Sequence, residues 1–221
     1  IQVTIQAAPI LRGISLELGS GERMGLVGRN GAGKTTVMRT ITGLADLAGG
    51  QIFWNGEDIT QMSPRDRARL GFGYMPEDRR LVPDLTVEEN MLLPAWANDA
   101  IDGPQRLQFV YDLMPELTKM SKRKALLLSG GQQKMVALGR ALIAGEKLLL
   151  LDEPFEGVAP ALAKRISDVI TSLKGDGLSV LIAQSELSHS SDLLQRESVI
   201  ERGEIIKVNV IDPTFANQVQ V

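Results

Sequence analysis

The sequence contains no cysteine and only one histidine among its 221 residues. The absence of cysteine excludes disulfides, a thiolate nucleophile and zinc-thiolate sites, and it fits a reducing compartment. The single histidine, His189, falls in a segment predicted to be helical, and no carboxylate stands at a spacing that suggests a partner. We therefore expect His189 to be a surface residue rather than part of a reactive site.

Long apolar runs and an excess of one charge sign are also missing. The longest clearly apolar stretches, residues 148–151 and 179–183, fall far below the ~20 residues that cross a bilayer. The chain is therefore expected to reach a membrane only by docking. Lys and Arg number 24 against 27 Asp and Glu, which gives a formal net charge of −3. No basic field favours nucleic acid, which we do not expect as a partner.

What the sequence does contain is an ordinary globular composition, with 43% hydrophobic and 23% charged residues. This composition excludes a disordered, collagen-like or coiled-coil chain. Stretches with strand character alternate with helical ones, which predicts an α/β fold with a largely parallel sheet. The predicted strands cover residues 13–18, 23–27, 51–54, 72–75, 147–151 and 178–183.

Three further elements are predicted toward the C-terminal end. Residues 161–173 repeat apolar side chains, such as Ile166 and Ile170, at a spacing that forms one helical face. After Ala183 we expect a short helix and then a hairpin that turns at residues 202–203 and closes the domain.

The middle section, from about residue 78 to 127, has no convincing strand. Thr86 and Glu89 form a capping box that would open a helix over residues 87–93, and a second helix is expected from about 104 to 114. Prolines and glycines punctuate the section, so we interpret it as a small helical insert. Residues 1–221 are thus one domain, with its core at about 1–77 and 128–221.

Residues 28–35, GRNGAGKT, follow a predicted strand and lead into a helical sequence. They match the pattern GxxxxGK followed by Ser or Thr, whose glycines let a loop curl until its N–H groups face a phosphate. In such a loop Lys34 would reach the β and γ phosphates, and the Thr35 hydroxyl would occupy one position on Mg²⁺. The residues predicted to bind the nucleotide here are Gly28, Arg29, Asn30, Gly31, Ala32, Gly33, Lys34, Thr35 and Thr36.

A second motif, KLLLLDEP at residues 147–154, is a short apolar strand that ends in two carboxylates. Asp152 is placed to hold Mg²⁺, usually through water, opposite Thr35. Glu153 could polarise a water aimed at the γ-phosphate, as a general base with no covalent intermediate. Two acids also end a strand simply where a chain reaches solvent, and the phosphate loop is what favours the functional interpretation. Together the two motifs predict hydrolysis.

A third motif, LSGGQQ at residues 128–133, precedes a helical sequence that Ser129 is suited to cap. Its two glycines expose the first N–H groups of the helix, which makes a second anion site. One chain has little use for two such sites around one nucleotide. The segment is therefore predicted to complete the phosphate cage of a neighbouring subunit through Ser129, Gly130, Gly131 and Gln132.

With these three motifs in this order, the sequence resembles the ATP-binding cassette (ABC) family, whose nucleotide-binding domains dimerise head to tail around two ATP molecules. The resemblance implies a P-loop NTPase core, RecA-like with an antiparallel β subdomain, plus a small helical insert. It also implies ATP and Mg²⁺ as cofactors, ATP hydrolysis as the activity, and a second ABC ATPase subunit as partner.

Within this family the nearest likeness is to ATPase subunits of bacterial importers for branched-chain amino acids and, more loosely, urea and related amides. The stretches that carry it are YMPEDRR (74–80), LTVEEN (85–90), LSGGQQKMVALGRAL (128–142) and DEPFEGVAP (152–160). The likeness implies transmembrane permease subunits, with a coupling helix received around residues 79–93. It also implies a peripheral position on the cytoplasmic face of the inner membrane.

Four positions depart from the commonest form of the family. Ile5 stands near the place of an aromatic residue that stacks on adenine, so weaker apolar contact is expected there. Glu77 stands where a Gln usually meets Mg²⁺ and the attacking water, and a carboxylate is still a competent Mg²⁺ ligand. Gln184 replaces a His that contacts the γ-phosphate and the catalytic water, and it cannot carry a positive charge. The stretch EGVAP lacks the common Asp near Ala159 and Pro160.

These departures favour the hypothesis that the chain pairs with a different ATPase subunit and hydrolyses ATP more slowly at its own site, with a homodimer as the alternative. The importer ATPase is our first interpretation. A soluble ABC ATPase that acts outside transport stays open, as does a nucleotide-binding subunit with little hydrolysis, which Gln184 supports. A P-loop kinase or GTPase is disfavoured by the LSGGQ helix and the acidic pair.

Overall fold

The computed structural model describes residues 1–6, 8–173, 177–185 and 193–212. His189 and the short helix predicted after Ala183 lie outside these residues. The strands are β1 (Gln2–Ile5), β2 (Ala8–Arg12), β3 (Arg23–Val27), β4 (Phe53–Trp54), β5 (Glu57–Asp58), β6 (Phe72–Met75), β7 (Leu148–Asp152), β8 (Ser179–Gln184), β9 (Arg196–Glu201) and β10 (Glu204–Val210). The helices are α1 (Lys34–Ile41), α2 (Pro64–Arg69), α3 (Val87–Ala97), α4 (Gly103–Leu113), α5 (Pro115–Thr118), the 3₁₀ helix η1 (Ala125–Leu127), α6 (Gly130–Ala144) and α7 (Pro160–Ser172).

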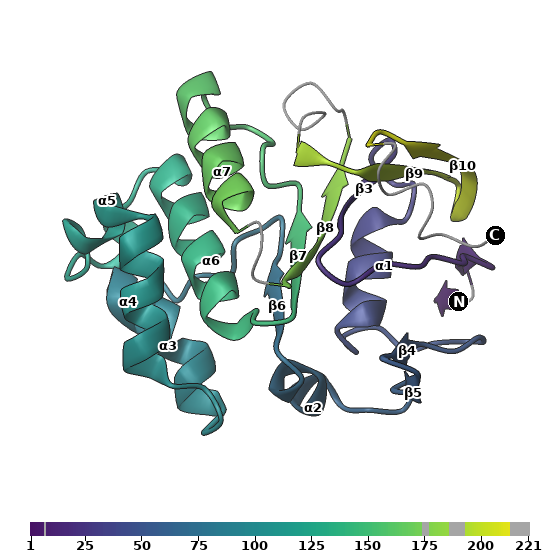
Figure 1. Cartoon of the computed structure of the whole chain (residues 1–221), viewed down its shortest axis with the longest axis horizontal. Coiled ribbons are helices and arrows are strands. Elements are labelled where there is room, and N and C mark those ends of the chain that lie inside the picture. The colour runs from purple at the N-terminus through teal and green to yellow at the C-terminus, as the bar shows by residue number, and fades with distance from the viewer. Residues whose placement is uncertain (7, 174–176, 186–192, 213–221) are drawn as a thin grey trace.

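Within the described residues the central sheet has six strands in the order β10-β9-β3-β8-β7-β6 (Figure 1). All run parallel except β10, which returns antiparallel beside β9. Val27 at the end of β3 pairs with Gln184 at the end of β8, and Asp152 at the end of β7 pairs with Ala183. The carboxyl ends of these three strands therefore meet at one edge of the sheet, where the loops that follow them lie together.

Strand β7 shows why the chain contains an unbroken run of leucines. Leu149 and Leu151 belong to a buried cluster shared with α6, α7 and the helical insert, whereas Leu148 and Leu150 belong to a second cluster shared with α1. Figure 1 shows α6 and α7 on one side of the sheet and α1 on the other. A strand covered on both faces has no solvent side, so its sequence does not alternate.

The helix over residues 161–173 and the hairpin predicted near the C-terminal end are confirmed. Helix α7 buries Ile166, Val169 and Ile170 on the predicted face. Strands β9 and β10 form the predicted hairpin, and Arg202 and Gly203 at its turn have positive φ angles of 47° and 82°. A Cβ at Gly203 would lie 2.0 Å from the carbonyl oxygen of Ile10, so the hairpin packs on β2 only with glycine at that position.

Residues 78–127 contain α3, α4, α5 and η1 and no strand. The capping box at the start of α3 is confirmed, since Thr86 and Glu89 exchange both of its hydrogen bonds. The predicted end of this helix at residue 93 is wrong, because α3 continues through Pro94 to Ala97. Helix α3 packs tightly against α6, because a Cβ at Gly139 would lie only 2.7 Å from the sulfur of Met91. The division of the chain into a core and an insert stays a prediction.

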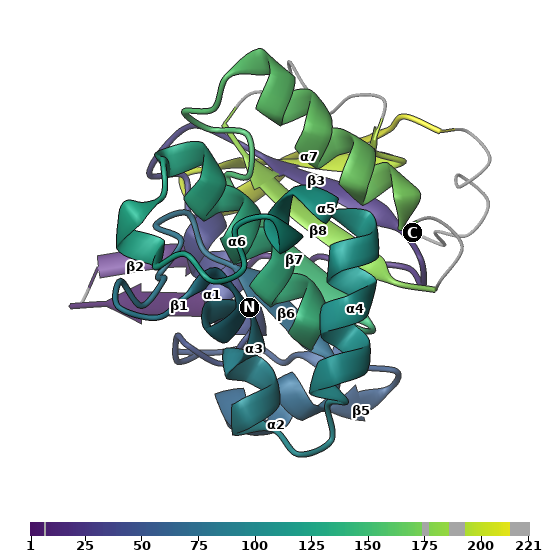
Figure 2. The same cartoon turned by 90° about the vertical axis from the view of Figure 1, so that its left-hand side faces the viewer.

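The predicted strand at residues 13–18 is also wrong. The antiparallel ribbon near the N-terminus consists of β1 and β2, which lie side by side in Figure 2. Residues 13–18 do alternate in burial, but Gly13 turns the chain with a φ of 103°, and this segment enters no sheet. The strand predicted at 51–54 is shorter than expected, because only β4 pairs with β5.

Candidate functional site

The loop after β3, residues 28–33, curls tightly before α1 begins at Lys34. Gly31 and Gly33 have φ angles of 82° and 111°, a region that favours glycine. Gly28 is required for another reason, since a Cβ there would lie 2.2 Å from the carbonyl oxygen of Ile200. The loop borders a cavity of about 520 Å³, whose lining residues are Gly28, Arg29, Asn30, Gly31, Ala32, Ser185, Val199, Ile200, Glu201 and Arg202.

The side chain of Lys34 is buried at the floor of this loop. Its Nζ donates to the carbonyl oxygens of Gly28 and Arg29 at 2.5 and 3.2 Å, and it forms an ion pair with Glu153 Oε1 at 3.0 Å. Both side chains of the pair are at most 5% exposed. An entering phosphate must therefore compete with Glu153 for the lysine.

Glu153, directly after β7, is held by a residue that sequence reasoning missed. Ser185 donates its hydroxyl to Glu153 Oε1 at 2.7 Å and its backbone N–H to Oε2 at 3.2 Å. The same hydroxyl lies 2.8 Å from Oδ1 of Asn30 in the loop. The available signal was the position of Ser185 directly after Gln184, at the sheet edge where β7 also ends.

Asp152, Thr35 and Glu77 line one further cavity of about 200 Å³. Asp152 is fully buried; its Oδ2 accepts from the Tyr74 hydroxyl at 3.3 Å, and its Oδ1 has no hydrogen-bond partner among the described residues. Burial raises the pKa of Asp152 to about 6, and the Thr35 hydroxyl opposes this shift. Burial, and then the charge of Glu156, also raise the pKa of Glu77.

This corner fits Mg²⁺ bound together with a nucleotide. Its donors are carboxylate and hydroxyl oxygens, the ligands that a hard cation prefers, and the unpartnered Asp152 oxygen is available. The described residues contain no cluster of three or more His, Cys, Asp or Glu side chains that could hold a metal ion. Mg²⁺ is usually bound by one or two carboxylates together with substrate phosphates, and this site has the same character.

Gln184 ends β8 at the same edge of the sheet. Its side chain is buried, and Oε1 has no hydrogen-bond partner among the described residues. Ile5, by contrast, ends β1 with 46% of its surface exposed and does not line the cavity of the loop. The roles of Gln184 at the γ-phosphate and of Ile5 at adenine stay predictions.

Ser129 caps α6 as predicted, in a second capping box. Its hydroxyl accepts the N–H of Gln132 at 3.3 Å, and Gln132 Oε1 accepts the N–H of Ser129 at 3.0 Å. Ser129 and Gly130 are exposed to solvent. No hydrogen bond or ion pair of the described residues joins 129–132 to the loop at 28–36, so these two predicted phosphate sites are separate within one chain.

Comparison with known proteins identifies the family. The sequence pattern described as ABC transporter matches residues 11–156. The chain belongs to the ABC transporter family. Its ATP-binding cassette is 36% identical over 196 residues to the high-affinity branched-chain amino acid transport ATP-binding protein BraG of Pseudomonas aeruginosa, with 89% of this chain and 84% of that protein covered. The lipopolysaccharide export system ATP-binding protein LptB of Escherichia coli is 34% identical over 199 residues, with 89% and 83% covered.

Solved structures agree with this assignment. The cassette matches the ADP conformation of MJ1267, an ATP-binding cassette of an ABC transporter, with a TM-score of 0.83 and 27% identity over 98% of this chain and 91% of that one. The dimeric ABC transporter cassette MJ0796 shares the fold, with a TM-score of 0.84 at 21% identity and 96% of each chain covered.

The family assignment confirms the predicted α/β P-loop fold and the predicted activity. ABC cassettes bind ATP, generally together with Mg²⁺, and hydrolyse it. The alternative of a P-loop kinase or GTPase is thereby excluded. No helix among the described residues has both the length and the apolar character needed to cross a membrane.

Proposed function

We propose that this cassette drives an importer of branched-chain amino acids or related small solutes. Relatives named for branched-chain amino acid transport support this cargo: BraG is 36% identical and the probable LivF of Archaeoglobus fulgidus 34% identical. A second candidate is export of a lipopolysaccharide-type cargo, which the similarity to LptB favours. A cassette that works outside transport, or one with little hydrolysis of its own, is the remaining alternative.

The proposed nucleotide site is the loop at residues 28–36 together with the two carboxylates at the end of β7, Asp152 and Glu153. The loop N–H groups and Lys34 would bind the phosphates, and Ile5 would contact adenine. Thr35, Asp152 and Glu77 would hold Mg²⁺, which would neutralise phosphate charge and polarise the γ-phosphate. The buried, unpartnered oxygen of Asp152 supports this assignment.

Glu153 is the proposed general base, and the observation that carries this proposal is its buried ion pair with Lys34. When a γ-phosphate binds Lys34, the carboxylate of Glu153 would lose its ion-pair partner and become able to accept a hydrogen bond from a water. Glu153 would then accept the proton of that water as it attacks phosphorus, while Ser185 keeps the carboxylate oriented. Gln184 would donate a hydrogen bond to the γ-phosphate or to the water.

We also propose that Ser129, Gly130, Gly131 and Gln132 complete the phosphate cage of a second ABC ATPase subunit. The exposure of Ser129 and Gly130, and the absence of any hydrogen bond to this chain's own loop among the described residues, support a site that acts in a partner. Glu77 and Gln184 favour a different subunit as that partner over a second copy. Permease subunits would dock around residues 79–93, which would place the cassette peripherally on the cytoplasmic face of the inner membrane.

Removal of the protein from its native cell tests the cargo. We expect loss of uptake of radiolabelled leucine or isoleucine at submicromolar concentration, restored by the wild-type chain and not by Glu153→Gln. Permease proteins should co-purify from detergent extracts. Normal uptake together with lipopolysaccharide trapped at the inner membrane would favour the export candidate and contradict the importer.

A further inference from the structure

Lys134, in the second turn of α6, is a buried cation outside the nucleotide site. Its side chain is 4% exposed and forms no ion pair among the described residues. Nζ instead donates to the carbonyl oxygen of Glu153 at 2.8 Å and to that of Glu156. Burial lowers the pKa of this lysine, with the charge of Glu156 opposing. An apolar side chain would fill the same space without the energetic cost of burying a charge. The two hydrogen bonds to carbonyls therefore indicate a role for the lysine beyond filling space.

Those two carbonyls belong to the turn that presents Glu153. The backbone of Glu153 has a φ of 49°, in the left-handed region that residues other than glycine rarely adopt. Its N–H donates to the carbonyl of Ala183 at 2.9 Å, and its carbonyl also accepts the N–H of Glu156 at 3.2 Å. Lys134 therefore adds a charged donor to a strained turn that hydrogen bonds hold on both sides.

The same helix presents Ser129 at its N-terminus. Ser129 and Lys134 are five residues apart, about 7.5 Å along a helix axis. One end of α6 is thus the surface proposed to meet a partner's nucleotide, while its second turn is bonded to the backbone of this chain's own proposed base. A shift of α6 would move both together.

We propose that Lys134 is a positioning residue that fixes the backbone of Glu153 to α6. The carboxylate of Glu153 then points toward the attacking water only when α6 is packed in its observed position. The inference rests on the proposed function, because it takes Glu153 as the base. It assigns to Lys134 no contact with nucleotide or water. When α6 contacts a partner subunit, a change in its position would therefore change the orientation of Glu153 in the same chain.

The first test replaces Lys134 with methionine, which has a similar length and no donor. We expect the single-turnover rate of ATP hydrolysis by the full chain to fall about 100-fold, since small misplacements of a catalytic group have effects of this size. The dissociation constant for ATP should stay within about twofold of wild type, because Lys34 and its loop are unchanged. Lys134→Arg, which keeps a charged donor, should restore most of the rate, and Lys134→Gln only part of it.

Met135→Leu is the matched control. Met135 is the next buried residue of α6, and the substitution conserves its volume and leaves the hydrogen bonds from Lys134 to the 153–156 turn in place. Its hydrolysis rate should equal that of wild type. Amide hydrogen exchange in residues 153–157, measured without nucleotide, should be faster in Lys134→Met and unchanged in Met135→Leu. A wild-type rate and wild-type exchange in Lys134→Met would overturn the inference.

Glu153→Gln distinguishes failure of the proposed function, in which Glu153 is the base, from failure of the inference about Lys134. If this variant hydrolyses ATP normally, Glu153 is not the base, and the positioning role is overturned with it. If it is inactive while Lys134→Met is fully active, the proposed function stands and only the inference fails. Should Lys134→Met not fold, equal rates in Lys134→Arg and Lys134→Gln would overturn the inference, and a faster Arg variant would support it.

Discussion

At the scale of single residues, the site is arranged around charges that satisfy one another before any ligand enters. Lys34 and Glu153 form a buried ion pair, and Ser185 holds the carboxylate from a neighbouring strand. Asp152 is the exception, because one of its oxygens is buried without a partner among the described residues. We therefore expect a bound nucleotide with Mg²⁺ to act differently on these residues. The ion pair of Lys34 and Glu153 would separate, whereas Asp152 would gain a partner for its unpartnered oxygen.

Glu153→Gln is expected to lower the rate of ATP hydrolysis at least 100-fold, because an amide cannot accept the proton of the attacking water. ATP should bind about threefold to tenfold more tightly, since Lys34 no longer has a carboxylate as competitor. Radiolabelled phosphate release and equilibrium binding measure the two effects. Glu204→Gln, which changes an exposed carboxylate of β10, is the control and should alter neither. Unchanged hydrolysis in Glu153→Gln would assign the base elsewhere.

The raised pKa of Asp152 predicts a pH dependence of stability. Its pKa is about 6 in the folded chain, against 3.8 for an ordinary aspartate. Between about pH 4 and 6 the folded chain keeps a proton that the unfolded chain has lost, so this group's contribution to the free energy of unfolding falls as pH rises. Asp152→Asn should therefore raise Tm by roughly 2–6 °C at pH 7 and much less at pH 4.5.

Thermal unfolding of the nucleotide-free protein at the two pH values measures this effect. Asp99→Asn, at an exposed position of the helical insert, is the control and should leave Tm unchanged at both. An equal gain for Asp152→Asn at pH 4.5 and 7 would contradict the assigned pKa.

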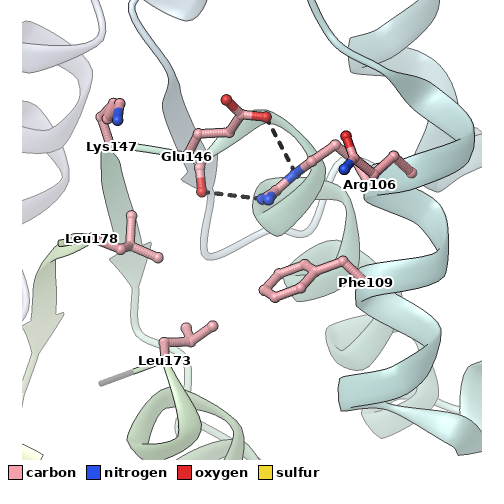
Figure 3. Close-up of a pocket in the computed structure, with 8 residues that line it drawn as sticks. Arg106, Phe109, Glu146, Lys147, Leu173 and Leu178 are labelled. Carbon is pink, nitrogen blue, oxygen red and sulfur yellow. Dashed lines mark hydrogen bonds and ion pairs between the residues drawn. The ribbon is translucent and has the colours of Figure 1, made fainter. Parts of the chain in front are cut away.

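At the scale of elements, a polar joint formed by Arg106, Glu146 and the carbonyls at the end of α6 links α4 to the core. Figure 3 shows Arg106 reaching from α4 toward Glu146, above Phe109, Leu173 and Leu178. Arg106 donates to the carbonyls of Leu142 and Gly145 at the end of α6, and its Nε lies 3.5 Å from Glu146 Oε1. Its guanidinium stands 4.6 Å from the centre of the Phe109 ring. A cavity of about 350 Å³ lies beside this joint, away from the residues of the nucleotide site.

Arg106→Met should lower the free energy of unfolding by about 1–3 kcal/mol, because carbonyls at the end of α6 lose a charged donor. The ATP dissociation constant should not change, since no group of the phosphate loop is touched. Urea denaturation and equilibrium binding measure both quantities. Gln105→Ala, at an exposed neighbouring position of α4, is the matched control. Loss of ATP binding in Arg106→Met without loss of stability would contradict a purely structural joint.

How much the sequence predicted depends on how local each feature is. The loop at 28–35, the acids at the end of β7, the capping box of α3 and the Ser129 cap of α6 are short patterns, and the sequence places each on the correct element. The contacts of Ser185 and Lys134 with Glu153 were not predicted, because they exist only once β8 and α6 lie beside the end of β7. For the same reason the strand predicted at residues 13–18 is wrong. The alternation of apolar and polar side chains there gives no information about which segments pair into a sheet.

At the scale of the whole molecule, the cassette carries two predicted phosphate-binding features on different elements. Ser129 is exposed at the start of α6, whereas the loop of Lys34 follows β3. In the proposed arrangement a complete site would need two chains. Each subunit would then bind one nucleotide with its own loop and contribute Ser129 to the nucleotide of the other subunit.

Complementation between two inactive variants tests this arrangement. Lys34→Ala lacks the phosphate lysine, and Ser129→Ala lacks the cap hydroxyl. Each alone should hydrolyse ATP at least 100-fold more slowly than wild type. A mixture should recover a clear fraction of the activity, because a mixed dimer contains one intact site. ATP binding to monomeric Ser129→Ala should be normal, which serves as the internal control. No recovery on mixing would contradict a composite site between two copies of this chain.

The ion pair between Lys34 and Glu153 has a consequence for which anions the resting cassette accepts. A carboxylate tethered 3.0 Å from the ammonium acts as a counter-ion of very high effective concentration. Orthophosphate must displace that counter-ion with little else to gain. A nucleoside triphosphate brings two further phosphoryl groups to the N–H groups of the loop. If Lys34 binds phosphate as proposed, we expect the resting cassette to bind polyphosphate ligands in preference to orthophosphate.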